Sequence, residues 1–354
     1  MRGFATEIVA MTAKLAEECI NLGEMCNFRC NFCSFAVFKG YIIKTSLNPK
    51  QPMQTIRSLN DLTAHLSQQG TRRRLSVVCG SDASTSGAVM RAVREGFAEA
   101  YFVGDCEAVR QTEAVSSYSG NHVHFIEADG HEDAAKKGVT LVGEGGADVL
   151  VKGLLHTETL LRAVLNKEWG ILPRGRVLTH IAMAEVPALR KLLFFSDAAV
   201  IPYPTHEQRV QQVAYMARML HAFGIEEPRI ALLHCAETVN EKFPHTLGYA
   251  EICERAANGE WGKLRVDGPL DLRTSLDPEA LRIKGIHSVL EGEADGLIVP
   301  DIEAGNILYK SLPLFASARM AGTLQGTLAP VVLPSRGDDE DAKFHSLALA
   351  TMSC

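Results

Sequence analysis

Short apolar runs alternate with helix-length amphipathic segments from about residue 53 onward, and this alternation predicts an α/β fold. The first complete unit has an apolar strand at 75–79, a polar loop at 80–86, a helix at 87–95 and a second strand at 100–103. Such a strand–helix–strand unit of roughly 30 residues is a βαβ motif with parallel strands. Ligands of parallel sheets bind at the carboxyl ends of the strands, so we expect the functional residues in the loops that follow them.

The same alternation continues and then restarts after a Pro- and Gly-containing linker at 173–176. Before the linker we predict strands at 122–126 and 147–153 and a helix at 157–165. After it we predict strands at 177–182, 192–195, 229–233, 296–299 and 331–333, and helices at 206–223, from about 302 to 318, and at 339–350. A chain of 354 residues is long for one core. We therefore predict two α/β domains with a cleft between them.

The stretch Val331–Glu340 carries the first candidate site. A buried strand ends at Pro334, and Ser335 and Arg336 stand before a helix whose first backbone N–H groups are free to bind an anion. The hydroxyl of Ser335 can donate a hydrogen bond, and the planar guanidinium of Arg336 suits two oxygens of a phosphate. The alternative is an ordinary helix cap beside a surface charge.

Two further strand ends carry polar groups. Lys152 and Gly153 close the strand at 147–153, where a lysine can hold a phosphate as a point charge, although a solvated loop lysine is the alternative. Asp301, Asn306 and Lys310 follow the strand at 296–299, with the last two one helical turn apart. Helix capping by Asp301 beside a surface lysine is the alternative there.

Three histidines invite a metal interpretation that we do not favour. His180, His206 and His234 have a spacing that matches no metal-binding template. We expect each to be a polar loop or capping residue.

Several segments together resemble the family of phosphate butyryltransferases and phosphate acetyltransferases. They are 147–157, 294–310 and 330–336, with Lys343 and 346–350 after them, so the resemblance covers roughly residues 53–350. It implies a fold in which the second α/β domain is inserted in the first, like that of isocitrate and isopropylmalate dehydrogenases. The first domain would comprise 53–167 plus 320–354, and the second 168–319.

The resemblance also implies a reaction: reversible transfer of a short-chain acyl group between CoA and inorganic phosphate, directly in a ternary complex. Ser335, Arg336 and Asp338 would be catalytic, with Arg336 as phosphate clamp and Ser335 as donor to an oxyanion or phosphoryl oxygen. Lys152, Gly153, Asp301, Asn306 and Lys310 would bind substrate. Acyl-CoA and phosphate would be the partners, no cofactor would be required because CoA is a substrate, and we expect a homo-oligomer.

The proton-handling group is the least defined part of this site. The aspartate that follows the Ser-Arg pair in phosphate acetyltransferases falls, counted without gaps, on Ala342, so we choose Asp338 and place Asp341 second. Arg273 also stands where an acid is expected. Acetyl specificity, or an inactive sensor of CoA or acyl phosphate, are the alternatives.

Residues 1–52 differ from the rest. Cys26, Cys30 and Cys33 have the spacing of the cluster loop of radical S-adenosylmethionine enzymes, which residues 19–38 resemble. Three thiolates could hold a [4Fe–4S] cluster with one open iron, giving an iron–sulfur alternative for the function. That family uses much of a β/α barrel, which needs on the order of 200 residues. We therefore expect an N-terminal extension that is not a folded domain.

Composition excludes other classes. The formal net charge is −6, and the longest basic run is Arg72–Arg74, which gives no electrostatic reason to expect nucleic acid as a partner. No apolar run reaches the roughly 18 residues that span a bilayer, so we expect no membrane contact. Most of the nine cysteines lie singly in apolar segments, which does not suggest a disulfide scaffold. A cytoplasmic enzyme is the expected class.

Overall fold

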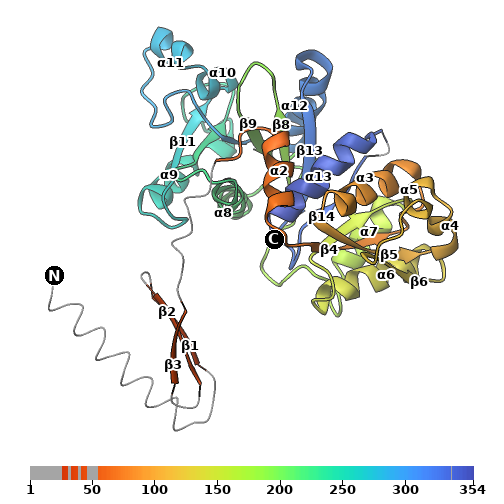
Figure 1. The fold of residues 1–354 in the computed structure, drawn as a ribbon. Helices are drawn as coiled ribbons and strands as arrows, with labels where there is room; N and C mark the ends of the chain where they lie inside the picture. Colours follow the sequence, from red (N-terminus) through yellow and green to blue (C-terminus); the bar gives the residue numbers. More distant parts are fainter. Residues whose placement is uncertain (1–25, 31–32, 39–40, 46–54, 336) are drawn as a thin grey trace. The chain divides into compact units, whose positions relative to one another are not determined.

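The computed structural model describes residues 26–30, 33–38, 41–45, 55–335 and 337–354 (Figure 1). The chain divides into two compact units, Met1–Gln54 and Thr55–Cys354. In the first, strands β1 (Cys26–Cys30), β2 (Cys33–Phe38) and β3 (Tyr41–Thr45) form an antiparallel sheet. These strands were not among the predicted elements. The cysteine side chains of the predicted cluster loop lie outside the described residues.

The second unit is built on one 11-stranded sheet with the order β11-β10-β12-β9-β8-β13-β14-β7-β4-β5-β6. Its strands are β4 (Arg73–Val78), β5 (Ala98–Gly104), β6 (Val123–Glu127), β7 (Val149–Lys152), β8 (Thr179–Glu185), β9 (Leu192–Ser196), β10 (Arg229–Leu233), β11 (Arg265–Leu270), β12 (Gly296–Ile298), β13 (Arg319–Gln325) and β14 (Val331–Val332). The predicted α/β class is confirmed, because helices separate most of these strands along the chain.

The helices of this unit follow the strands in the expected alternation. They are α2 (Leu59–Gln68), α3 (Ala83–Arg94), α4 (Cys106–Arg110), α5 (Glu113–Ser116), α6 (Gly130–Gly143), α7 (Thr157–Val164), α8 (His206–Ala222), α9 (Tyr249–Ala257), α10 (Leu272–Leu276), α11 (Pro278–Lys284), α12 (Ile302–Ala316) and α13 (Glu340–Met352), with a 3-10 turn at Pro244–Thr246. Helix α3 begins earlier than predicted, because the Asp82 carboxylate accepts a hydrogen bond from the Thr85 N–H and caps it.

Two parallel blocks of strands meet at an antiparallel seam. Strands β11, β10, β12 and β9 are parallel neighbours, as are β14, β7, β4, β5 and β6. Between them β8 and β13 pair antiparallel along their full length, from Arg319 opposite Glu185 to Gln325 opposite Thr179. The blocks match the strands assigned to the two expected domains, but the seam makes the sheet continuous. The exact domain boundaries stay a prediction.

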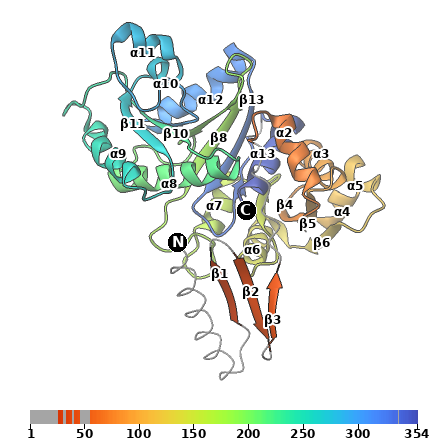
Figure 2. The same ribbon diagram turned by 60° about the vertical axis from the view of Figure 1, so that its left-hand side comes forward.

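Helices cover the sheet (Figure 2), and the buried side chains between helices and strands form three clusters. One large cluster joins side chains of α2, α3 and α13 to those of α8 and α9. A second lies under α6 and α7, and a third under α12. Helix α13 packs against both α2 and α3. Its position returns the C-terminal segment to the block formed by β14, β7, β4, β5 and β6, as the inserted-domain arrangement requires.

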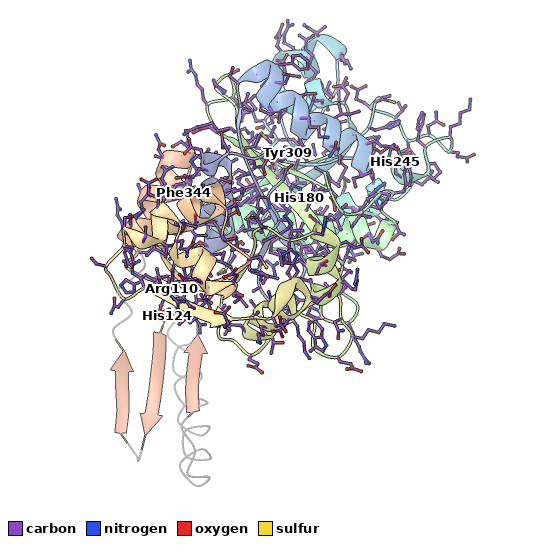
Figure 3. The ribbon with its side chains drawn as sticks, turned by 90° about the vertical axis from the view of Figure 1, so that its right-hand side faces the viewer. Arg110, His124, His180, His245, Tyr309 and Phe344 are labelled. Carbon is purple, nitrogen blue, oxygen red and sulfur yellow. The ribbon has the colours of Figure 1, made fainter. Side chains whose placement is uncertain are left out.

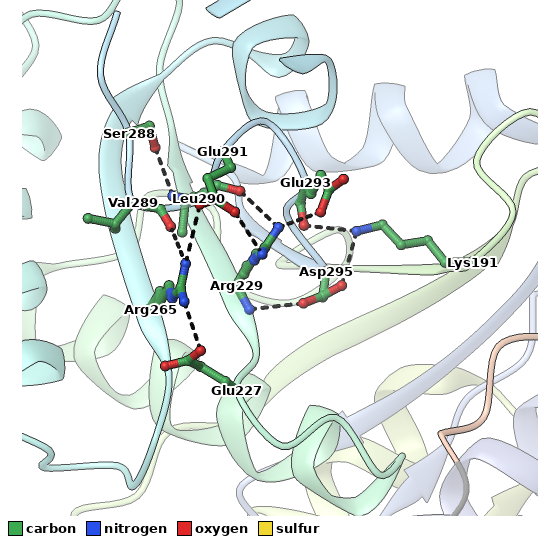
Figure 4. Close-up of polar contacts among 10 residues, drawn as sticks. All are labelled: Lys191, Glu227, Arg229, Arg265, Ser288, Val289, Leu290, Glu291, Glu293 and Asp295. Atoms are coloured by element: carbon green, nitrogen blue, oxygen red, sulfur yellow. Dashed lines mark hydrogen bonds and ion pairs between the residues drawn. The ribbon is translucent and has the colours of Figure 1, made fainter.

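The amino ends of β9, β10, β11 and β12 are closed by a network of ion pairs (Figure 4). The Asp295 carboxylate accepts hydrogen bonds from the Arg229 N–H at 2.9 Å and from Lys191 Nζ at 3.0 Å. The guanidinium of Arg265 donates to Glu227 at 2.9 Å. These groups hold the amino ends of the four strands together, so the network has a structural role. Among the described residues, no helix is long and apolar enough to cross a membrane.

Candidate active site

The carboxyl ends of β14 and β7 place three of the predicted residues, Ser335, Lys152 and Gly153, at one edge of the sheet beside the end of β4. Val332 pairs with Val151, and Val78 pairs with Lys152, in parallel register. The loop with Ser335 therefore leaves the sheet beside Lys152. Parallel pairing places strand ends that are far apart in sequence at the same edge, which is where α/β proteins bind ligands.

Gly153 lies in close contact with the loop that follows β4. Its N–H donates to the carbonyl of Val78 at 2.8 Å, and the N–H of Leu154 donates to the carbonyl of Cys79 at 2.6 Å. A Cβ at position 153 would lie 2.1 Å from the Cys79 carbonyl oxygen, so only glycine fits. The role of Gly153 visible here is this close approach of two backbones.

Lys152 is buried, with 5% of its surface exposed, and its Nζ donates to the Gly153 carbonyl at 3.3 Å. The alternative of a solvated loop lysine is therefore wrong. Burying an ammonium group is unfavourable unless partners or a bound anion stabilise the charge. Its burial at the carboxyl edge is compatible with the predicted contact to phosphate.

The loop between β14 and α13 is folded on itself around Asp338. The Ser335 N–H donates to Asp338 Oδ2 at 2.8 Å, and the Asp338 N–H donates back to the Ser335 carbonyl at 3.2 Å. The hydroxyl Oγ of Ser335 accepts from the Gly337 N–H at 3.4 Å. Arg336 lies outside the described residues. Two of the three predicted catalytic residues are thus joined directly.

Burial raises the pKa of the Asp338 carboxyl above its ordinary value, although the Ser335 N–H and the positive charge of Lys343 act in the opposite direction. A carboxylate with a raised pKa is a better proton acceptor than a solvated one. By contrast, Asp341 is exposed and pairs with Arg91 at 2.7 Å. This geometry favours Asp338 over Asp341 as the proton-handling group.

Lys343 fixes the start of α13, a role that the sequence did not reveal. Its Nζ contacts Asp82 Oδ1 at 3.0 Å, Ser84 Oγ at 2.7 Å and Thr85 Oγ1 at 2.9 Å. These groups form the N-terminal turn of α3, and Asp82 belongs to the polar loop 80–86 that the sequence singled out. Lys343 had appeared only among the residues of the family resemblance.

Helix α12 carries a residue that sequence reasoning missed. Burial raises the pKa of Tyr309 to about 12, and the negative charge of Asp338 acts in the same direction. Tyr309 follows Asn306 by three residues, on the turn that a helix periodicity would have marked as inward. The signal was present in the sequence but was assigned to Asn306 and Lys310.

The predicted residues of α12 have other contacts. Asp301 caps the helix by accepting from the Ala304 N–H at 2.8 Å, as the alternative interpretation proposed. The Asn306 amide donates to the Ala198 carbonyl at 3.1 Å, where it holds the turn after β9, and Lys310 is exposed. The structure therefore shows structural roles for Asp301 and Asn306, while their contact with substrate stays a prediction.

The histidines divide into different classes. His206 begins α8 next to the capping residue Thr205, as expected. His234 follows β10, where its Nδ1 lies 3.1 Å from Nε2 of His245. The expectation for His180 was wrong, because it lies inside strand β8 rather than in a loop or cap. Arg273, found where an acid was expected, pairs with Asp277 on its own helical turn at 3.2 Å.

A neighbouring cavity of about 770 Å³ opens at the carboxyl ends of β4, β5 and β6. Its lining includes Ser81, Gly104, Asp105, Glu127 and Leu154. Ser81 and Leu154 come from the same loops that carry Asp82 and Gly153. The edge expected to bind ligands is therefore hollowed beside the candidate site.

Metal binding receives no support within the described part of the chain. No group of three or more His, Cys, Asp or Glu side chains there could hold a metal ion. Cys30 and Cys33 face each other in the register of β1 and β2, but their side chains lie outside the described residues, as does that of Cys26.

Comparison with known proteins gives one consistent result. A sequence model of the family described as phosphate acetyl/butaryl transferase matches residues 116–351. Phosphate butyryltransferase of Clostridium acetobutylicum is 35% identical over 297 residues, which cover 84% of this chain and 98% of that protein. Phosphate acetyltransferase of Thermotoga maritima is 35% identical over 284 residues, covering 80% and 96%.

A solved structure agrees with these relatives. The branched-chain phosphotransacylase from Enterococcus faecalis V583 has 32% sequence identity and a TM-score of 0.69, over 79% of this chain and 98% of that one. The resemblance of residues 19–38 to a radical S-adenosylmethionine loop gains no support from these matches. The extent of the family match and the identity to near-complete relatives lead to one conclusion: the chain belongs to the phosphate acetyl/butaryl transferase family.

Proposed function

We propose that this chain transfers a short-chain acyl group reversibly between CoA and inorganic phosphate, by direct transfer in a ternary complex. Family membership supports the reaction class, and the relatives named phosphate butyryltransferase favour a butyryl-like acyl group. The observation that carries the site is the direct link between Ser335 and Asp338 at the carboxyl edge, beside buried Lys152.

The proposed reaction begins with attack of a phosphate oxygen on the thioester carbonyl. The carbonyl oxygen becomes an oxyanion, the carbon–sulfur bond breaks, and the thiolate of CoA leaves and is protonated. Ser335 would donate its hydroxyl to a phosphoryl oxygen, and Lys152 would contribute positive charge. Arg336 keeps its expected role as phosphate clamp on sequence grounds. Asp338 would accept the proton of the attacking hydrogen phosphate and pass it to the departing thiolate, and would accept the thiol proton in the reverse direction.

CoA enters this reaction as a substrate, and the proposal uses no further cofactor. The cytoplasmic location, the homo-oligomer and the substrate contacts of Gly153, Asp301, Asn306 and Lys310 stay predictions. Acetyl specificity is the main alternative, because one or two methylenes change discrimination by only about 1–3 kcal/mol each.

The test is release of free CoA from butyryl-CoA, measured with and without phosphate on the full chain. We expect release that depends on phosphate, and a loss of roughly 100-fold or more in kcat for Ser335→Ala. Ser119→Ala, at an exposed position after α5, is the matched control and should behave like the wild type. Tight binding of CoA without turnover on acetyl-, butyryl- or isobutyryl-CoA would instead indicate the inactive sensor.

A further inference from the structure

His180 is a half-buried residue with one buried polar atom that the fold does not satisfy. Its Nδ1 is shielded from solvent and has no hydrogen-bond partner among the described residues. Burial lowers the pKa of His180 below its ordinary value, against the opposing charge of Asp197, so the ring is neutral near pH 7. A buried polar atom without a partner is unfavourable, and native structures keep few of them without a functional reason.

The surrounding structure is shaped to hold this ring. The backbone N–H of His180 donates to Asp197 Oδ2 at 3.1 Å, which fixes the strand at this point. On the neighbouring strand, a Cβ at Gly322 would lie 2.4 Å from His180 Nε2, so glycine leaves the space that the imidazole fills. A side chain on any other residue at position 322 would displace the ring.

His180 is related to the candidate site through its contact with Tyr309 on α12. Its ring meets that of Tyr309 edge-on, with 5.9 Å between centroids, and both residues are labelled in Figure 3. The charge of Asp338, which accepts a hydrogen bond from the Ser335 N–H, also acts to raise the pKa of Tyr309. The imidazole therefore contacts a residue whose pKa depends on the predicted catalytic loop.

The chemistry around His180 suits one part of the substrate. Tyr309 also packs against Phe195, with 6.3 Å between ring centroids; Phe195 belongs to the buried apolar cluster under α12, and the partly buried Tyr309 packs against that cluster. A neutral imidazole in apolar surroundings offers a single hydrogen bond and no net charge. That matches an acyl carbonyl with its apolar chain, whereas a doubly charged phosphate needs cationic groups such as Lys152.

We propose that His180 is a substrate-binding residue whose Nδ1–H donates a hydrogen bond to the carbonyl oxygen of the acyl group. The inference rests on the proposed acyl transfer and refines it, because it assigns the hydrogen-bond donors of the two substrates to two different residues. His180 serves the acyl oxygen as it becomes an oxyanion, and Ser335 serves the phosphate. His180 itself forms no covalent bond and releases no proton in this role.

The first test compares kinetic constants on butyryl-CoA and phosphate. His180→Phe keeps an aromatic ring and removes the donor, and we expect its kcat to fall roughly 100-fold with little change in the KM for phosphate. His180→Asn places an amide nitrogen near the position of Nδ1 and should recover at least about tenfold of that loss. His345→Phe is the matched control, since His345 is a buried histidine on α13 whose ring lies edge-on to that of Phe344.

The second test measures the hydrogen bond itself by binding, which a structural role would not move. Butyryl-CoA and S-butyl-CoA differ only in the carbonyl oxygen. The wild type should bind butyryl-CoA about five- to tenfold more tightly, and His180→Phe should bind both equally. An unchanged preference in His180→Phe, or in His180→Ala if the first variant does not fold, overturns the inference. Lack of phosphate-dependent turnover in the wild type would overturn the proposed function instead.

Discussion

The ion pair between Lys343 and Asp82 gives the sharpest prediction about stability. It joins the first turn of α13 to the first turn of α3, across 261 residues of sequence, and the two side chains are only 11% and 18% exposed. Lys343→Met keeps the length of the side chain and removes the ammonium group. The variant loses three contacts and leaves the Asp82 carboxylate without its cationic partner.

The magnitude follows from the burial of this pair. Removing one partner of a fully buried pair costs about 3–5 kcal/mol, and the limited solvent access here reduces that to about 2–4 kcal/mol. Asp82→Asn keeps the capping oxygen, so the Lys343→Met/Asp82→Asn double variant isolates the interaction between the two side chains. We expect a coupling free energy of about 2 kcal/mol in that cycle.

Urea unfolding of the four proteins at pH 7, followed by circular dichroism, measures these free energies. Each single variant should lower the unfolding midpoint without changing the slope, and the double variant should lose less than the sum. Additive losses, or a Lys343→Met protein as stable as the wild type, would show that the pair contributes nothing. The turnover of Lys343→Met should also fall, because α13 carries the Ser335–Asp338 loop at its start.

The pH dependence of this pair has a defined sign. Burial acts to raise the pKa of Asp82, but hydrogen bonds from Thr85, Lys343 and Ser84 outweigh it and lower the pKa below the ordinary value of 3.8. The contribution to stability is therefore complete above about pH 4 and is lost as the pH falls through the lowered pKa. Lys343→Met should lose less stability than the wild type when acidified below pH 4.

Three further predictions concern single positions. Gly153→Ala should destabilise the fold by about 1–3 kcal/mol in urea unfolding, since its Cβ meets the Cys79 carbonyl; a neutral result would contradict the close approach. Burial lowers the pKa of His345 to about 4, so below pH 6.5 the unfolded chain binds a proton at His345 that the folded protein does not, and the folded state loses stability. His345→Gln should therefore lose about 2 kcal/mol less folding free energy than the wild type between pH 7 and pH 5, measured by urea unfolding. Asp338→Asn should remove the acidic limb of the pH–kcat profile and lower kcat roughly 100-fold, and an unchanged profile would exclude Asp338 as the proton carrier.

The sequence by itself predicted nine of the eleven strands of the large sheet, without β11 and β13, and the strand ends that carry the candidate site. Apolar periodicity reports local burial, and it correctly placed α8, predicted at 206–223, and the strand–helix pair that brackets Ser335. The family resemblance was visible in the short segments 147–157, 294–310 and 330–336, each of which is contiguous in the sequence. All of these signals are local, so a single sequence contains them.

Only the tertiary structure decided which side chains share an environment. Lys152 ends a strand as a surface lysine would, and it is buried because β14 and β4 pair on either side of β7. Asp82 and Lys343 meet because the chain, after forming the block of β9 to β12, returns to the block that contains β4 and β7. Tyr309 and His180 come together because β8 pairs with β13 under α12. Periodicity records whether a residue faces inward, but the order of strands in the sheet decides which residue it meets there.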